Sequence, residues 1–137
     1  MPGYSGTPLP KKLGIKSGSR VLFAELPAEV RRELSATLDE CSLLDNWKAP
    51  LDFAMVFTKT RVALEKHFAG ATRTLAPAGM LWVSWAKKSS GVVTELDENL
   101  VRETGLAAGL VDVKVCAVTD VWSGLKFVRR VKDRGKA

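Results

Sequence analysis

The hydrophobic residues of the chain form two alternating patterns: short continuous runs and longer amphipathic stretches. The continuous runs cover residues 20–25, 51–57 and 80–85, and runs of this length are typical of buried parallel strands. Between the runs, apolar residues recur every three or four positions, as they do on the inner face of a helix. This alternation predicts a parallel sheet with helices on both of its faces.

Three helices are predicted from the spacing of the apolar residues. The first begins at Pro27, the second begins after Thr58 or Thr60 and ends at residues 76–79, and the third begins at Asp97. Their inner faces carry Val30, Leu34, Leu38, Leu64, Phe68, Ala71, Leu75, Leu100, Val101, Thr104, Ala107 and Ala108.

A closing hairpin is predicted from residues 111–118 and 124–131, where apolar residues alternate with polar or small ones. Residues 41–44 add a short strand. The expected fold is therefore an α/β, three-layer, Rossmann-like and mostly parallel sheet of six strands and three helices, with a C-terminal antiparallel hairpin. The hairpin edge at 122–131 allows a weak sheet-edge dimer, so we expect a monomer or a weak dimer.

The chain of 137 residues has the length of one domain, and we divide it into three segments. Residues 1–18 are an N-terminal arm, 19–131 a single α/β domain and 132–137 a basic tail. Leu9, Leu13 and Ile15 would hold the arm against the domain. They would bring two candidate contact residues, Lys11 and Lys12, over a pocket or a partner surface, unless the arm is only structural.

Composition excludes several classes of protein. With 46% hydrophobic and 26% charged residues the chain is not disordered, and it has no apolar stretch of membrane-spanning length. It also lacks an N-terminal apolar block typical of a secretory signal. Two distant cysteines, Cys41 and Cys116, give neither a disulfide framework nor a metal-binding spacing. We therefore expect small buried thiols in a cytoplasmic protein without a bound metal or membrane contact.

The formal net charge of +6 is distributed in segments. Residues 1–20, 59–91 and 121–137 are basic, whereas 21–58 and 92–120 are acidic. The last basic segment could contact phosphates. It lacks interleaved aromatic residues for base stacking, so we expect a solubilising tail and no nucleic-acid partner. The residues concerned are Arg129, Arg130, Lys132, Arg134 and Lys136.

Candidate ligand-binding residues follow the predicted parallel strands, because open α/β sheets bind ligands beyond the carboxyl ends of their strands. Two neighbouring strands end in lysines, beside hydroxyl groups and a tryptophan that could stack on a ligand. This chemistry suits a phosphate or carboxylate. The alternative is that the lysines are solvated loop charges and the tryptophan belongs to the core. The candidates are Thr58, Lys59, Trp85, Lys87, Lys88 and Ser89.

Part of the chain resembles class I S-adenosylmethionine-dependent methyltransferases. The relevant strings are LDFAMVF at 51–57 and LAPAGMLWV at 75–83, each followed by a predicted element in the expected order. In those enzymes an aspartate opens the fourth strand and a leucine-x-proline-glycine-glycine turn opens the fifth. The resemblance covers about half of the chain and implies a truncated version of that fold.

A second resemblance spans nearly the whole chain. The strings GYSGTPLPKKLGI at 3–15, GLAAGLVDVKVC at 105–116 and WSGLKFVRR at 122–130 resemble domain-of-unknown-function family 3052. That family consists of small bacterial proteins, so the resemblance implies a bacterial source and carries no activity.

The turn after the first strand argues against an active methyltransferase. It reads ELPAE at 25–29, without the glycines that let a backbone approach a cofactor, and its two carboxylates and proline would crowd that site. The length also leaves no room for the usual seven strands. His67, the single histidine, lies one position off the helix stripe and is expected to face solvent, which leaves no catalytic pairing.

We therefore expect a non-catalytic binding protein without a cofactor. It would recognise an anionic small molecule or a protein partner at the strand ends. The alternatives are a degenerate S-adenosylmethionine-dependent methyltransferase-like enzyme and a nucleic-acid-associated accessory protein.

Overall fold

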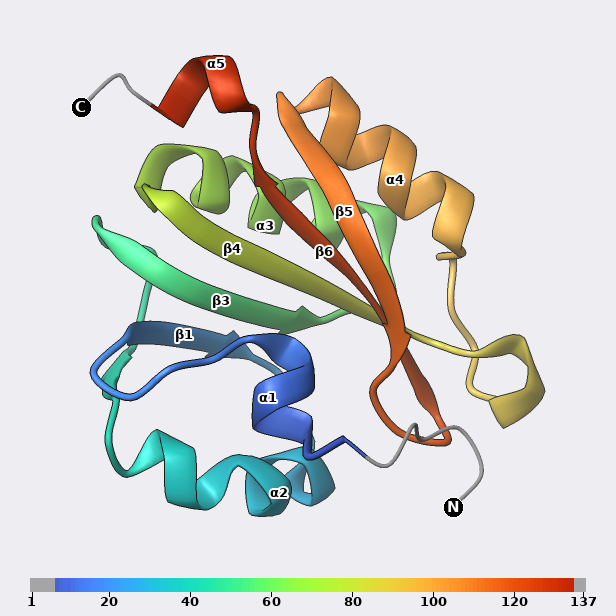
Figure 1. The fold of residues 1–137 in the computed structure, drawn as a ribbon. Helices are drawn as coiled ribbons and strands as arrows, with labels where there is room; N and C mark the ends of the chain where they lie inside the picture. The colour runs from blue at the N-terminus through green and yellow to red at the C-terminus, as the bar shows by residue number, and fades with distance from the viewer. Residues whose placement is uncertain (1–6, 135–137) are drawn as a thin grey trace.

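The continuous apolar runs pair as neighbouring parallel strands in the computed structural model, which describes residues 7–134. One six-stranded sheet has the order β2-β1-β3-β4-β6-β5, and β6 runs antiparallel to both of its neighbours, β4 and β5 (Figure 1). The expected sheet edge at 122–131 is therefore wrong: β6 is paired on both sides, and the edge strand is β5. The strands are β1 (Arg20–Ala24), β2 (Ser42–Leu44), β3 (Leu51–Phe57), β4 (Leu75–Ala86), β5 (Leu110–Ala117) and β6 (Trp122–Arg129).

Helices cover both faces of this sheet, which confirms the predicted three-layer Rossmann-like architecture (Figure 1). α3 and α4 pack on one face around Phe68, Leu81 and Phe127, whereas α1 and α2 pack on the other around Leu34 and Trp82. The helical elements are α1 (Leu9–Leu13), α2 (Ala28–Leu38), α3 (Arg61–Thr74), the 3₁₀ turn η1 (Lys88–Ser90), α4 (Glu98–Ala107) and α5 (Val131–Arg134).

The start of β4 differs from the prediction. Residues 76–79, expected to end a helix, belong to the strand, which begins at Leu75 beside Leu51. A Cβ on Gly79 would lie 2.5 Å from the carbonyl oxygen of Leu51, so only glycine allows the two backbones to approach this closely. Pro77 and Gly79 favour a turn, but the pairing of Leu75 with Leu51, 24 positions earlier, keeps this segment in the strand. The sequence alone does not show that pairing.

The arm is part of the core from Leu9 onward. Leu9, Leu13 and Ile15 are buried as predicted, and the fully buried Leu13 accepts a 2.8 Å hydrogen bond from the indole Nε1 of Trp82 through its carbonyl. Gly14 ends α1 in the left-handed conformation, with φ +80°. The arm is therefore held by apolar burial and by a buried hydrogen bond to the central strand β4. Its residues 1–6 lie outside the described residues.

The basic tail is largely tied to the sheet up to Arg134. The guanidinium of Arg129 donates hydrogen bonds to the carbonyls of Thr72 and Leu75, and that of Arg134 donates to the carbonyl of Arg129. Arg129 thus caps the end of α3, which is a structural role. Lys136, also assigned to the tail, lies outside the described residues.

Both cysteines are free thiols, as predicted, but they are half-buried rather than buried. The Cys41 thiol, just beyond the end of α2, donates to the carbonyl of Thr37 in that helix. Within residues 7–134, no helix has the length and apolar content to cross a membrane.

Shortening Leu13 to alanine is expected to lower the free energy of unfolding by about 2–5 kcal/mol, because it opens a cavity under the arm. Urea unfolding followed by tryptophan fluorescence measures this change. The matched control, Lys11→Ala in the same helix, alters an exposed side chain and should change stability by less than about 0.5 kcal/mol. If Leu13→Ala lowers the free energy of unfolding as little as Lys11→Ala does, the arm contributes nothing to the stability of the core.

Candidate functional site

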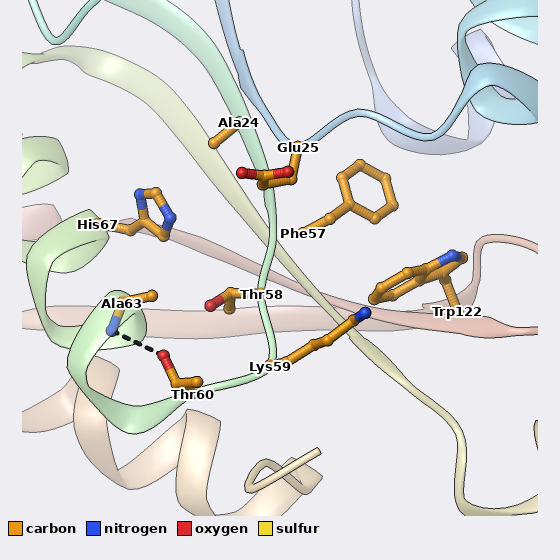
Figure 2. Close-up of a pocket in the computed structure, with 9 residues that line it drawn as sticks. All are labelled: Ala24, Glu25, Phe57, Thr58, Lys59, Thr60, Ala63, His67 and Trp122. Atoms are coloured by element: carbon orange, nitrogen blue, oxygen red, sulfur yellow. Dashed lines mark hydrogen bonds between the residues drawn. The ribbon is translucent and has the colours of Figure 1, made fainter. Parts of the chain in front are cut away.

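A pocket of about 400 Å³ opens at the carboxyl ends of β1 and β3. The chain leaves β1 into α2 on one face of the sheet and leaves β3 into α3 on the other, so the pocket lies at the point where the strand order reverses. Open α/β sheets bind their ligands at such a point. Its lining residues are Ala24, Glu25, Phe57, Thr58, Lys59, Thr60, Ala63, His67 and Trp122 (Figure 2).

Glu25 follows β1 directly and has an unusual backbone conformation. Its φ of +57° places it in the left-handed region, and it is the one non-glycine residue there within residues 7–134. This conformation costs roughly 1 kcal/mol or more for a residue with a Cβ, and such strain is concentrated at functional sites. The turn therefore has the backbone that a glycine would favour and carries a carboxylate at the pocket mouth.

Thr58 forms the floor of the pocket, where it follows β3. Its side chain is 5% exposed, and its hydroxyl has no hydrogen-bond partner within residues 7–134, although its amide donates to the carbonyl of Ser84 at 3.1 Å. The buried hydroxyl of Ser84 also has no partner there. Leaving such a group unpaired costs about 1–3 kcal/mol, so Thr58 offers a hydrogen bond that a ligand could complete.

His67 lies on the wall of the pocket, on α3, and the expectation that it faces solvent is wrong. Its ring lies on the same side of the pocket as α3 and points toward the carboxylate of Glu25 (Figure 2). Burial lowers the pKa of His67 from its ordinary value of 6.5, and the charge of Glu25 partly opposes this change. The imidazole is consequently neutral at pH 7 and can accept a proton. The indole ring of Trp47 flanks it at 6.1 Å.

Phe57 and Trp122 form an apolar wall opposite α3. Their rings meet edge to face with centroids 5.2 Å apart, and the side chain of Lys59 extends toward Trp122 (Figure 2). The carbonyl of Lys59 accepts a 2.8 Å hydrogen bond from the amide of Glu95, which ties the end of β3 to the segment before α4. The pocket thus combines an aromatic wall with one acidic and one basic group at its mouth.

The structure brings together only part of the predicted site. Thr58 and Lys59 line the pocket, but Lys87, Lys88 and Ser89 lie in and before η1 and contribute nothing to its lining. Trp85 is 6% exposed and packs in the core on the α3 and α4 face, so it cannot stack on a ligand there. β4 continues to Ala86 because it pairs with β6 along its whole end, and this carries the lysines past the pocket.

Among the lining residues that the sequence does not predict, His67 and Trp122 have the most distinctive chemistry. The signal for His67 was helical spacing: Thr60 caps α3 by accepting a 3.2 Å hydrogen bond from the amide of Ala63, and His67 lies one turn after Ala63 on the same side. Trp122 comes from β6, and no local pattern links it to β1 or β3.

Between residues 7 and 134, no three His, Cys, Asp or Glu side chains gather closely enough to hold an ion.

No protein-family model and no curated protein sequence matches the chain. Solved structures do match it, methyltransferases and fibrillarins among them. A TehB-like SAM-dependent methyltransferase from Corynebacterium glutamicum has a TM-score of 0.57 at 9% identity, over 93% of this chain and 90% of that one. Fibrillarin from Aeropyrum pernix, with natively bound S-adenosyl-L-methionine, has a TM-score of 0.55 at 14% identity, over 92% and 70%.

A methyltransferase from Pyrococcus furiosus is similar to the same extent, with a TM-score of 0.55 at 14% identity, over 87% of this chain and 78% of that one. At these identities the likeness concerns the fold alone. The chain has the fold of class I S-adenosylmethionine-dependent methyltransferases, as its resemblance at 51–57 and 75–83 implied.

The prediction of a non-catalytic binding protein is contradicted by these comparisons, which favour a methyltransferase-like protein. It depends on the length of the chain, on the turn at 25–29 and on the lack of a catalytic pairing, and the first two arguments do not hold. The chain was considered too short, yet it covers 90% of the Corynebacterium protein. Residues 25–29 were expected to crowd a cofactor, yet Glu25 has the left-handed backbone of a glycine turn and Glu29 is not among the residues that line the pocket.

The pKa of His67 is expected to lie below 6.5, and Glu25→Gln should lower it further because it removes the stabilising negative charge. A pH titration of the imidazole carbon-bound protons by NMR measures both, and a single histidine needs no assignment. Because the unfolded chain then binds more protons than the folded one, stability should fall as the pH drops below 6.5. His67→Gln should remove this component. A pKa at or above 6.5 would contradict the burial of the imidazole.

Proposed function

We propose that this chain is a methyltransferase-like protein that binds S-adenosylmethionine in the pocket between β1 and β3. The observation that carries the proposal is the hydroxyl of Thr58, which is 5% exposed and unpartnered within residues 7–134, on the floor of a pocket at the switch point of a methyltransferase fold. The volume of about 400 Å³ lies in the range of roughly 300–1,000 Å³ found for small-molecule sites.

The charges at the pocket mouth support this choice of ligand. S-adenosylmethionine has an α-amino acid group, which carries an ammonium and a carboxylate. In the pocket, the carboxylate of Glu25 can pair with the ammonium and the ammonium of Lys59 with the carboxylate. The aromatic wall of Phe57 and Trp122 suits a flat or positively charged ligand group. The two charged groups and the aromatic wall therefore fit S-adenosylmethionine, the cofactor that the fold implies.

Asp45 is a further candidate contact. It follows β2, whose Leu44 lies beside Leu22 of β1, so it reaches the same edge of the sheet as Glu25. Related dinucleotide-binding folds use an acidic residue about 20 positions after the first turn to bind ribose hydroxyls, and Asp45 has this spacing from Glu25.

The residues of the pocket also suggest how a proton would be handled. When bound, S-adenosylmethionine supplies a methyl group on a positively charged sulfur. His67, neutral at pH 7, would accept the proton that an acceptor molecule loses, and the carboxylate of Glu25 would stabilise the resulting imidazolium. Thr58 would orient the bound molecules through its hydroxyl.

The remaining expectations from the sequence belong to this proposal. We propose that the protein works in the cytoplasm, as a monomer or a weak dimer, and that it is a member of domain-of-unknown-function family 3052. The strings at 105–116 and 122–130, which fall largely in the β5–β6 part of the sheet, support that membership through their resemblance to the family.

Isothermal titration calorimetry with S-adenosylmethionine and with its demethylated product, S-adenosylhomocysteine, tests the proposal. Thr58→Val removes the hydroxyl but keeps the β-branched shape, so binding should weaken about 5–30-fold, the equivalent of one hydrogen bond to a buried partner.

Thr72→Val is the matched control, because the hydroxyl of Thr72 donates to the carbonyl of Ala69 within α3 and lines no part of the pocket. It should bind as the unmodified chain does. Absence of binding by the unmodified chain would refute the proposal, and equal binding by Thr58→Val would place the cofactor elsewhere.

A further inference from the structure

Three lysines gather on the sheet face that α1 partly covers. On β6, Leu125 and Phe127 belong to the core on the α3 and α4 side, so Lys126 points to the opposite face. Lys114 on β5 is its direct cross-strand partner. The third lysine, Lys12, lies in α1 and is one of the two arm residues that the sequence analysis names as candidate contacts.

Hydrogen bonds hold two of these lysines in place: Lys114 of β5 is bonded to α1, and Lys12 of α1 is bonded to β5. The ammonium of Lys114 donates to the carbonyl of Lys12 at 3.0 Å, and the ammonium of Lys12 donates to the carbonyl of Ala117 at 2.8 Å. An ammonium has three N–H groups, so one carbonyl does not exhaust the donors of Lys114. The arm and the hairpin therefore position two positive charges rather than leaving them on mobile side chains.

Lys126 is the third charge and lies beside the end of α1. Its Nζ would be 3.9 Å from a Cβ placed on Gly14, and its side chain makes no hydrogen bond or ion pair within residues 7–134. Burial and the neighbouring Lys114 both lower the pKa of Lys126. Like charges directly opposite one another on a sheet are destabilising, so the pairing of Lys126 with Lys114 has a cost that no ion pair of the described residues offsets.

No acidic side chain of the described residues forms an ion pair with Lys114 or Lys126. The ion pairs found in that part of the chain both involve Arg102, which holds Glu98 and Asp112 beside α4. The field of the lysines reaches a neighbouring thiol: burial raises the pKa of Cys116, while Lys12 and Lys114 act to lower it. Positive charge thus accumulates on one patch, where Lys114 and Lys126 have no carboxylate of residues 7–134 bound to them.

We propose that Lys12, Lys114 and Lys126 form a binding site for a phosphate group, separate from the strand-end pocket. A phosphate monoester carries nearly two negative charges at neutral pH and three acceptor oxygens, which matches several ammonium groups better than one carboxylate would. Lysine binds phosphate as a point charge, and this requires only that the ammonium groups lie close together. The site shares no lining residue with the pocket.

Inorganic phosphate is the first probe. Its binding is measured from the shift in the thermal unfolding midpoint, relative to chloride at equal ionic strength, and from amide NMR shifts along β5 and β6. Lys126→Met keeps much of the length of the side chain and removes a partly buried, repelled charge, so the variant should fold at least as stably as the unmodified chain. Its phosphate affinity should fall about tenfold or more, which is the effect of losing one charged hydrogen bond.

Lys88→Met is the matched control, since it removes the same charge from an exposed position in η1. It should leave phosphate affinity unchanged. The proposal is refuted if phosphate acts no differently from chloride on the unmodified chain, or if the two variants lose affinity equally, which would indicate a response to net charge alone.

A short single-stranded RNA, used at the same ionic strength, identifies the source of the phosphate. If the RNA binds and Lys126→Met weakens it more than Lys88→Met does, the phosphate belongs to a nucleic-acid backbone. If Lys126→Met weakens the binding of inorganic phosphate but the RNA does not bind, the natural ligand of the site is a small molecule that carries a phosphate group. Neither result depends on whether the pocket binds S-adenosylmethionine, so the two proposals can fail separately.

Discussion

The parallel pairing of β1 with β3 is the constraint on which the site depends. Val21 lies beside Phe53 and Ala24 beside Val56, so both strands end at the same edge of the sheet. The helices that follow them pack on opposite faces, which leaves a pocket directly beyond the two strand ends. The pocket results from this geometry whatever side chains line it, and the side chains then decide its chemistry.

The strands that form the hydrophobic core also carry polar groups of the candidate site, and some of these groups are buried without a hydrogen-bond partner within residues 7–134. β3 and β4 are buried on both faces, yet two buried hydroxyls at or just beyond their ends, Thr58 and Ser84, have no partners within residues 7–134. Glu25 adds a strained backbone beside them. These costs gather beyond the ends of neighbouring parallel strands, where open α/β sheets bind ligands, and they mark this region as the candidate site.

The arm connects the core under α2 with the C-terminal hairpin, on one face of the sheet. Leu13 fills the core under α2 and accepts a hydrogen bond from Trp82, while Lys12 of the same short helix meets the hairpin. One segment outside the Rossmann-like unit therefore closes its hydrophobic face and completes a cluster of positive charge. The strand-end pocket and the lysine cluster lie on different parts of the sheet and share no residues.

Local pattern determined the elements, because strand and helix periodicity need only neighbouring residues. The continuous runs predicted β1, β3 and β4, and Asp97 predicted the start of α4. Of the two possible caps for α3, Thr58 and Thr60, the structure uses Thr60. The strand ends pointed to Thr58 and Lys59, which line the pocket. Tertiary structure decided everything that depends on distant pairing.

The long pairing of β4 with β6 buried Trp85 and carried Lys87 away from the pocket, and it brought Trp122 in. Sequence alone placed His67 on the wrong side of its helix, since one position on a helix corresponds to a rotation of about 100° and only packing fixes which side is covered. The backbone conformation of Glu25 is likewise imposed by the fold, because its residue type gives no sign of it.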